Sequence, residues 1–292
     1  FRVLDPACGS GNFLYLALLE LKNIEHLANL EAEALGFPRE FPRIGPEAVL
    51  GIELNPYAAE LARVSVWIGE IQWMRRNGFE AARNPILRTL DTIQNRDAVL
   101  GPDGGRAEWP RADVVVGNPP FLGGKKVLSE LGKDYVDALR NAYKGTLPNF
   151  SDLVCYWFAQ AWGQMKSGEL QRAGLVSTNS IRGGSNREAL KPIVDEGQIF
   201  EAWSDEEWTV DGAAVRVSMI CFAKEQSVST KLDGHHVSTI FADLTANEVD
   251  LTRSATLVVN SGCAFIGVQK TGPFDVDGEL ARTWLTAPLN PN

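Results

Sequence analysis

Residues 118–121, Asn-Pro-Pro-Phe, combine a carboxamide that can donate and accept hydrogen bonds with an aromatic ring that can stack. They follow a run of valines with high strand propensity. Neither Pro119 nor Pro120 has an N–H for a strand ladder, so we expect the strand to stop here. Asn118 and Phe121 are therefore held at the carboxyl end of a strand, where open α/β sheets place their ligand crevice.

A second candidate site is the glycine turn in residues 5–14, DPACGSGNFL. Gly9 and Gly11 allow a tight turn close to a ligand, and the helix expected after them favours an anionic group at its N-terminus. A dinucleotide fingerprint needs a third glycine where this chain has Leu14. The turn therefore suits a compact ligand with a carboxylate, such as the methionine part of S-adenosylmethionine, although a lone Gly-x-Gly is also common in purely structural turns.

Two acids follow at the ends of the next expected strands. Glu53 lies where doubly wound folds bind ribose hydroxyls, though farther along the chain than the compact spacing of about 20 residues, so we expect a long first helix or an insertion. Asp97 can accept a hydrogen bond from an adenine amino group. Each acid alone is an ordinary solvated strand-end residue. Right-handed crossovers, however, would bring all four features to one sheet edge, which makes chance placement a poor explanation.

The elements that position these residues alternate between strand and helix over about 225 residues, which predicts a mostly parallel α/β sheet with helices on both faces. The segment between the last two strands is too short for a crossover helix, so we expect that pair to be antiparallel. The expected strands span residues 2–5, 48–53, 92–99, 112–117, 172–178, 198–205 and 213–225. The expected helices begin near Asn12, at Asn55 or Pro56, near Glu130 and after Ser151 as N-cap.

Composition is that of an ordinary soluble globular protein, with 45% hydrophobic and 22% charged residues among 292. The formal charge of −9 does not favour a polyanionic partner unless charge is segregated. No apolar run approaches about 18 residues, so we expect no membrane span. The four cysteines are far apart and form no Cys-x-x-Cys pair, which is typical of reduced thiols in the cytoplasm. We expect no metal site, because His235 and His236 fit a polar turn.

The glycine turn and the Asn-Pro-Pro-Phe sequence resemble motifs I and IV of the S-adenosylmethionine-dependent amino-methyltransferases, specifically the DNA N6-adenine enzymes in which motif I precedes motif IV. The wider run, with GIELNPYAAELA, FSDLVCYWF, GLVSTNSIRGGSNREAL and DGAAVRVSMICF, is similar to the methyltransferase part of single-polypeptide restriction-modification enzymes. The resemblance implies a Rossmann-like methyltransferase fold, with a mostly parallel seven-stranded sheet and a final antiparallel strand. It implies a catalytic domain over 1–225 and a linker or the beginning of a target-recognition region over 226–292.

The resemblance also implies a role for each matching residue. The carboxamide oxygen of Asn118 and the carbonyl of Pro119 would accept both hydrogens of a target amine, beside Pro120, and Phe121 would stack on the base. The freed lone pair of the amine could then attack the sulfonium methyl group without an enzyme nucleophile. The residues expected to bind S-adenosylmethionine are Asp5, Ala7, Gly9, Gly11, Asn12, Glu53, Leu54, Asp97 and Ala98.

The implied partner is double-stranded DNA. Its expected phosphate contacts are Lys125 and Lys126, with Lys133 nearby, and Arg182 and Arg187, with Lys191 nearby; a solvated charged face is the ordinary alternative. Because two glycines precede Lys125, we hypothesise that the segment over 122–149 is a mobile flap that closes on DNA, with an ordinary surface connection as the alternative. Since the chain starts with Phe1, just before its first expected strand, we expect a longer polypeptide that carries nuclease and target-recognition domains elsewhere.

Other functions remain open at this point. A cytosine-C5 enzyme is nearly excluded, because its nucleophilic cysteine usually follows a proline and none of the four cysteines here does. Cytosine-N4 enzymes usually have serine where Asn118 stands. Enzymes that methylate RNA bases or protein glutamine also use Asn-Pro-Pro-aromatic, although the glutamine enzymes favour tyrosine at the position of Phe121. A non-catalytic DNA-recognition module with a degenerate pocket is disfavoured, because no cofactor motif is visibly broken.

Overall fold

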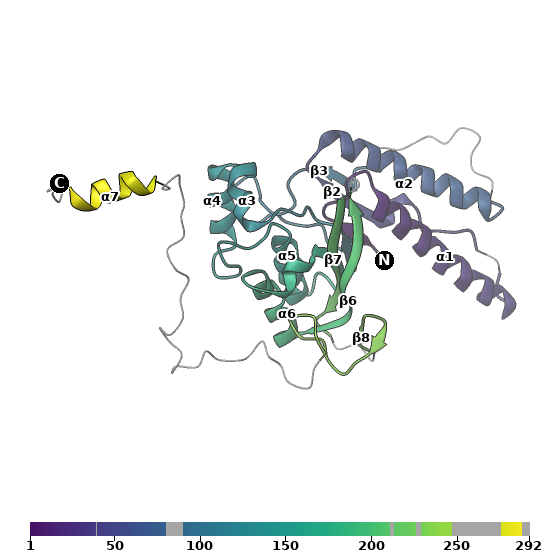
Figure 1. Cartoon of the computed structure of the whole chain (residues 1–292). Coiled ribbons are helices and arrows are strands. Elements are labelled where there is room, and N and C mark those ends of the chain that lie inside the picture. Colours follow the sequence, from purple (N-terminus) through teal and green to yellow (C-terminus); the bar gives the residue numbers. More distant parts are fainter. Residues whose placement is uncertain (39, 80–89, 211–212, 226–228, 247–275, 288–292) are drawn as a thin grey trace. The chain divides into compact units, whose positions relative to one another are not determined.

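The computed structural model describes the chain except residues 39, 80–89, 211–212, 226–228, 247–275 and 288–292 (Figure 1). The chain divides into two compact units, Phe1–Thr252 and Arg253–Asn292. In the second unit the described element is helix α7, Gly278–Thr286, whose N-cap Asp277 accepts a hydrogen bond from the Glu279 N–H. Among the described residues, no helix has the length and apolar character needed to span a membrane.

The first unit is built on one sheet, with the described strands in the order β3-β2-β1-β4-β5-β7-β6-β8-β9. Neighbouring strands from β3 to β5 pair in parallel, and β7 is antiparallel to both β5 and β6. The predicted α/β fold and the antiparallel final pair are therefore confirmed, and two short strands extend the edge beyond the seven expected. The strands are β1 Val3–Asp5, β2 Val49–Glu53, β3 Ile93–Asn95, β4 Val114–Gly117, β5 Arg172–Thr178, β6 Gln198–Val210, β7 Ala213–Ala223, β8 Lys231–Leu232 and β9 His235–His236.

Helices cover both faces of this sheet (Figure 1). On one face α1 and α2 enclose a core that contains Leu14, Val66 and Ile93. On the other face α5 lies in a larger core, in which Phe158 stacks on Phe222 of β7. The helices of this unit are α1 Asn12–Ala34, α2 Pro56–Arg76, α3 Gly124–Leu131, α4 Lys133–Ala142, α5 Cys155–Ser167 and α6 Lys191–Glu196, with 3-10 turns η1 Pro46–Ala48, η2 Asn179–Arg182 and η3 Asn186–Ala189.

Helix α2 begins where the sequence predicts, but its apolar stripe is not its buried face. The Asn55 side chain caps the helix by accepting from the N–H groups of Tyr57 and Ala58, and Pro56 occupies the first turn. The apolar residues that recur at helical spacing and predict this helix are largely exposed: Leu61, Val64, Ile68 and Ile71. The buried face consists mainly of small residues: Ala59, Ala62, Val66, Gly69, Trp73 and Met74.

The prediction that Ser151 caps the next helix is wrong. Helix α5 begins at Cys155, because the preceding residues form a turn in which the Cys155 N–H donates to the Asp152 carbonyl. The side-chain oxygen of Ser151 is buried and has no hydrogen-bond partner among the described residues. A residue type that favours N-caps is therefore used here inside a tight connection.

The segment over 122–149 forms two helices, α3 and α4, instead of one helix in a loop. Val127, Val136 and Leu139 are buried in the main core. A side chain at Gly124 would collide with the carbonyl oxygen of Phe150, so this glycine permits close packing. Movement of the segment on DNA stays a prediction.

The first compact unit, Phe1–Thr252, continues past residue 225, where the catalytic domain was expected to end. Strands β8 and β9 join the sheet, and Ile240 and Leu244 are buried in the main core. The assignment of 226–292 as a linker or the start of a target-recognition region stays a prediction.

Candidate active site

The Asn-Pro-Pro-Phe loop leaves the sheet at the carboxyl end of β4. Pro119 is buried, and the Asn118 side-chain oxygen Oδ1 is buried without a hydrogen-bond partner in the described structure. A Cβ on Gly117 would lie 2.8 Å from Asp5 Oδ1, so glycine is needed for β1 and β4 to bring their ends together here. The loop therefore presents an unused acceptor at a tightly packed edge of the sheet.

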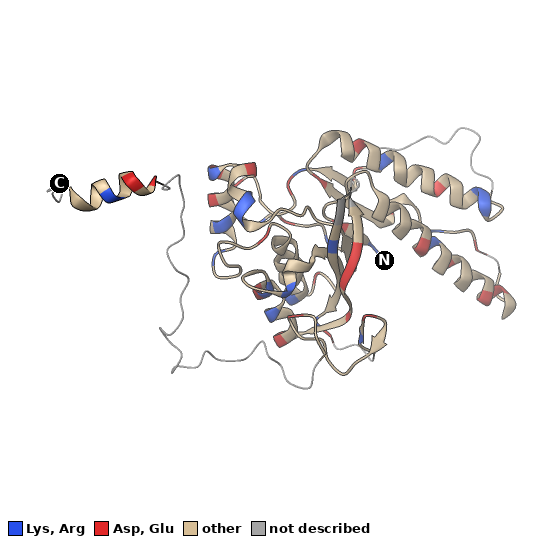
Figure 2. Ribbon diagram, viewed as in Figure 1, with Lys and Arg blue, Asp and Glu red and all other residues tan. Residues whose placement is uncertain are grey.

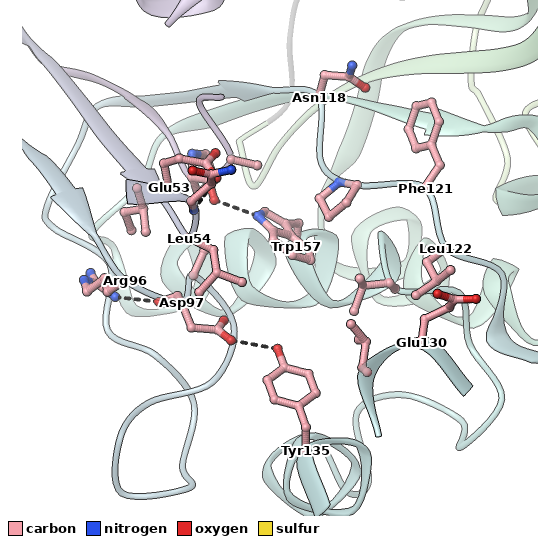
Figure 3. A pocket seen from close by; sticks show the side chains of 18 of the residues that line it. Glu53, Leu54, Arg96, Asp97, Asn118, Phe121, Leu122, Glu130, Tyr135 and Trp157 are labelled. Atoms are coloured by element: carbon pink, nitrogen blue, oxygen red, sulfur yellow. Dashed lines mark hydrogen bonds between the residues drawn. The ribbon is translucent and has the colours of Figure 1, made fainter. Parts of the chain in front are cut away.

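A cleft of about 1080 Å³ runs beside this loop (Figure 3). The predicted site residues that line it are Ala7, Glu53, Leu54, Asp97, Ala98, Asn118, Pro120 and Phe121. Residues predicted to bind the cofactor and residues predicted to bind the target base thus line the same cleft. The predicted residues that do not line it are Asp5, Gly9, Gly11, Asn12 and Pro119, together with the four predicted DNA contacts.

Glu53 ties the glycine turn to the start of α2. Its Oε2 accepts from the Gly9 N–H at 2.8 Å, and its Oε1 accepts from the Asn55 N–H at 2.8 Å. A carboxylate has about four acceptor positions, so each oxygen retains capacity for a ligand hydroxyl. The predicted ribose-binding acid is therefore held in place by two backbone donors.

The two glycines of the turn have different structural roles. Both have positive φ, +52° at Gly9 and +88° at Gly11. A Cβ on Gly11 would lie 2.8 Å from the Cα of Ala62, so Gly11 lets α1 approach α2. The Gly11 N–H donates to the Cys8 carbonyl, and Gly9 donates to Glu53. An anionic ligand would therefore meet the first turn of α1, from Asn12 onward, instead of these two amides.

Asp5 is a buried carboxyl at the end of β1. Its Oδ1 accepts from the Ala7 N–H at 3.0 Å. Burial raises the pKa of Asp5 to about 7, with the negative charge of Glu53 adding to the rise and the Ala7 hydrogen bond opposing it. Asp5 therefore titrates near neutral pH, unlike an ordinary surface aspartate.

Asp97 is fixed by three donors. Its Oδ1 accepts from the N–H groups of Val99 and Leu100 at 2.7 and 3.0 Å, which forms a turn and ends β3 earlier than expected. Its Oδ2 accepts from the Tyr135 hydroxyl at 2.7 Å (Figure 3). One acceptor position of Oδ2 remains for a ligand amine.

Two aromatic residues in the cleft were not predicted. Tyr135 comes from α4, and burial together with Asp97 raises the pKa of its hydroxyl. Trp157 comes from α5 and donates from its ring N–H to the Pro6 carbonyl at 3.0 Å. In the sequence, both occur in helical stretches where an aromatic side chain normally indicates core packing.

The predicted DNA-binding cations are not equivalent. Lys125 and Lys126 are exposed on α3. Arg182 donates from Nε to the Asp243 carbonyl at 3.1 Å, whereas the Nε of Arg187 is buried without a hydrogen-bond partner in the described part of the chain. Lys191 forms an ion pair with a neighbouring glutamate.

Charges of both signs are interspersed on α3 and α4, and acidic residues mark β6 (Figure 2). The described surface of these helices is therefore not a patch of a single sign. Within the described residues, no cluster of three His, Cys, Asp or Glu side chains could hold a metal ion.

The strand order, with an Asn-Pro-Pro-Phe loop at the carboxyl edge of the sheet, is that of an α/β domain of the methyltransferase type. The chain belongs to the family described as MmeI, DNA-methyltransferase domain, whose sequence profile matches residues 1–233. The resemblance drawn from the motifs is thereby confirmed, and the chain carries a DNA-methyltransferase domain.

Individual relatives agree with this family. DNA methyltransferase A of Bacillus subtilis (strain 168) is 30% identical in an alignment of 196 residues that covers 63% of this chain and 21% of that protein. The Type IIL restriction-modification enzyme MmeI, solved in complex with DNA, is 24% identical with a TM-score of 0.67 over 85% of this chain and 36% of that one. The ATP-dependent Type ISP restriction-modification enzyme LlaBIII, solved bound to DNA, is 14% identical with a TM-score of 0.50 over 79% of this chain and 17% of that one. These two structures support the fold.

Proposed function

We propose that the chain transfers a methyl group from S-adenosylmethionine to the N6 amine of an adenine flipped out of double-stranded DNA. The observation that carries this proposal is that Asn118, which lines the same cleft as Glu53 and Asp97, has a buried Oδ1 without a hydrogen-bond partner among the described residues. Burying an acceptor without a hydrogen-bond donor costs about 1 to 3 kcal/mol of folding free energy. A ligand that donates an N–H to this oxygen would recover that free energy as binding energy. An exocyclic amine offers two such hydrogens, the second for the carbonyl of Pro119.

The residues present fit the cofactor. Glu53 and Asp97 each retain an acceptor position for a ribose hydroxyl and an adenine amine, with Leu54 and Ala98 beside them in the cleft. The methionine half would lie toward the glycine turn, with its carboxylate at the first turn of α1. S-adenosylmethionine supplies a sulfonium methyl group when bound.

The chain's own residues then act by orientation. Asn118 and Pro119 hold both hydrogens of the amine, which leaves the nitrogen lone pair free to point at the methyl group. Once the nitrogen carries the methyl group, one of these hydrogens leaves as a proton to water. Phe121, which lines the cleft, stacks on the flipped base. No side chain is required as a nucleophile, because the orientation of the amine and the hydrogen bonds to it account for the acceleration of the reaction.

DNA is proposed to contact the rim of the site through Lys125, Lys126, Arg182 and Arg187. Flipping a base costs a few kcal/mol, which phosphate contacts near the cleft offset. Since the chain spans 21% of its curated relative, nuclease and target-recognition domains are proposed to lie elsewhere in the full-length protein.

The test is to incubate plasmid DNA, and in parallel reactions RNA and protein, with the full-length protein and radiolabelled S-adenosylmethionine, and then to identify the modified nucleoside or amino acid. N6-methyladenine supports the proposal. Labelled N4-methylcytosine contradicts the choice of base, and label found instead in RNA or in protein glutamine contradicts the choice of substrate. Specific DNA binding with no label in any of these substrates indicates a non-catalytic recognition module.

A further inference from the structure

Asp152 lies against the exit of the Asn-Pro-Pro-Phe loop. Its Oδ1 accepts from the Gly124 N–H at 2.7 Å. The next residue, Leu153, donates its N–H to the Leu122 carbonyl at 2.9 Å. Two consecutive residues before α5 therefore hold the chain on both sides of Gly123, just after the residues proposed to bind the target base.

The same carboxylate also holds the loop that follows β5. Its Oδ2 accepts from the Ser180 hydroxyl at 2.7 Å and from Nδ2 of Asn186 at 2.8 Å. The backbone N–H of Asp152 donates to Oδ1 of Asn186 at 2.8 Å, so the Asp152–Asn186 contact runs in both directions. This second loop, η2 and η3, carries Arg182 and Arg187.

The packing around Asp152 and Gly124 leaves little room for either loop to move. Gly124 is buried, and any side chain there would collide with the Phe150 carbonyl oxygen. Its N–H belongs to the first turn of α3, where backbone donors have no partner inside the helix and a carboxylate is favourable. Three donors converge on one carboxylate, and a carboxamide could accept them through only one of its two terminal atoms.

We propose that Asp152 is a positioning residue for methyl transfer, which fixes the exit of the Asn-Pro-Pro-Phe loop against the loop that carries Arg182 and Arg187. The inference rests on the proposed function. Leu122 and Leu153 line the cleft, whereas Asp152 does not, so its effect on the reaction passes through the loop. A change at Asp152 should therefore lower the rate of transfer and leave cofactor affinity unaltered.

The experiment is a reciprocal exchange in the full-length protein: Asp152→Asn, Asn186→Asp and the double variant that carries both changes. In Asp152→Asn the side-chain NH₂ group faces hydrogen-bond donors and cannot accept from them. In Asn186→Asp two carboxylates face each other. The double variant restores a carboxylate opposite a carboxamide. Single-turnover methyl transfer to duplex DNA should slow on the order of 10²-fold in each single variant, as small misplacements of reacting groups do. It should largely recover in the double variant.

Calorimetric binding of S-adenosylmethionine and thermal melting separate this role from a structural one. Cofactor affinity should match the wild type in all three variants.

A wild-type rate of methyl transfer in Asp152→Asn overturns the inference, and so does a folded double variant that is as slow as the two single variants. If Asp152→Asn does not fold, Ser180→Ala removes one donor to the same carboxylate and should slow transfer several-fold; an unchanged rate there overturns the inference as well. A wild-type protein that methylates no DNA contradicts the proposed function, whereas equal activity in wild type and Asp152→Asn contradicts only the role of Asp152.

Discussion

The Gly9 N–H donates to Oε2 of Glu53 at 2.8 Å, which joins the turn after β1 to the end of β2. The second oxygen of Glu53 accepts from the Asn55 N–H that precedes α2. One carboxylate therefore sets the distance between the two turns that border the cofactor end of the cleft. Glu53 lines the cleft, and its carboxylate keeps acceptor capacity for the proposed ribose.

Replacing Glu53 should weaken cofactor binding before it affects any other step. In Glu53→Ala a ribose hydroxyl pair loses a charged acceptor, a loss of about 1.5 to 3 kcal/mol, or roughly 10- to 150-fold in dissociation constant. Calorimetric titration with S-adenosylmethionine measures it. Glu53→Gln, which keeps one acceptor oxygen, should show a smaller loss. Wild-type affinity in Glu53→Ala would place this carboxylate outside the cofactor site.

Asn118→Ala should have the opposite profile. The carboxamide oxygen faces the target amine in the proposal, so methyl transfer should be almost abolished while cofactor affinity stays nearly unchanged. Single-turnover transfer and calorimetry on the same preparation give both quantities. Asn141→Ala, an exposed asparagine on α4, is the matched control and should behave as the wild type. A large loss of cofactor binding in Asn118→Ala would refute the assignment.

The exposed pair Lys125 and Lys126 should contribute to DNA binding without regard to sequence. The double alanine variant removes up to two phosphate contacts, so the slope of log affinity against log salt concentration should become shallower by up to about 1.8. Fluorescence anisotropy at several salt concentrations, on specific and unrelated duplexes, measures this slope. Lys166→Ala, an exposed lysine near the end of α5, is the control. If the slope of the double variant equals that of the wild type, α3 is only a connection.

The sequence is informative where structure is determined locally. The positions of glycine and proline and of the N-capping residue correctly predict the starts of α1 and α2 and the end of β4, because these boundaries depend on neighbouring residues. Parallel order then brings the acids and Asn118 to one edge. The same local rule fails at Ser151, where a turn tied to the loop after β5 displaces the helix start.

The unpredicted part of the site depends on contacts between distant residues. Tyr135 reaches Asp97 across 38 positions, and Trp157 reaches Pro6 across 151. Asp152 meets Ser180 and Gly124 from either side in the chain, each 28 positions away. No periodicity within one helix indicates which distant group its side chain will meet, so such partners emerge only from the packed fold.

The buried carboxyl of Asp5 should make stability depend on pH near neutrality. Its pKa is raised from 3.8 to about 7, so between these values the folded state keeps a proton that the unfolded state has lost. The free energy of unfolding therefore falls as pH rises through this window, by up to about 4 kcal/mol from Asp5. Below pH 3.8 Asp5 is protonated in both states, and the stability that is lost at higher pH is fully present. Because Asp5→Asn cannot titrate, the difference in unfolding free energy between wild type and variant isolates the effect from all other carboxylates. Urea unfolding from pH 4 to pH 8 should show the wild type losing stability relative to the variant. A difference that stays constant across this range would mean that Asp5 ionises at its ordinary pKa and is hydrated in the folded protein.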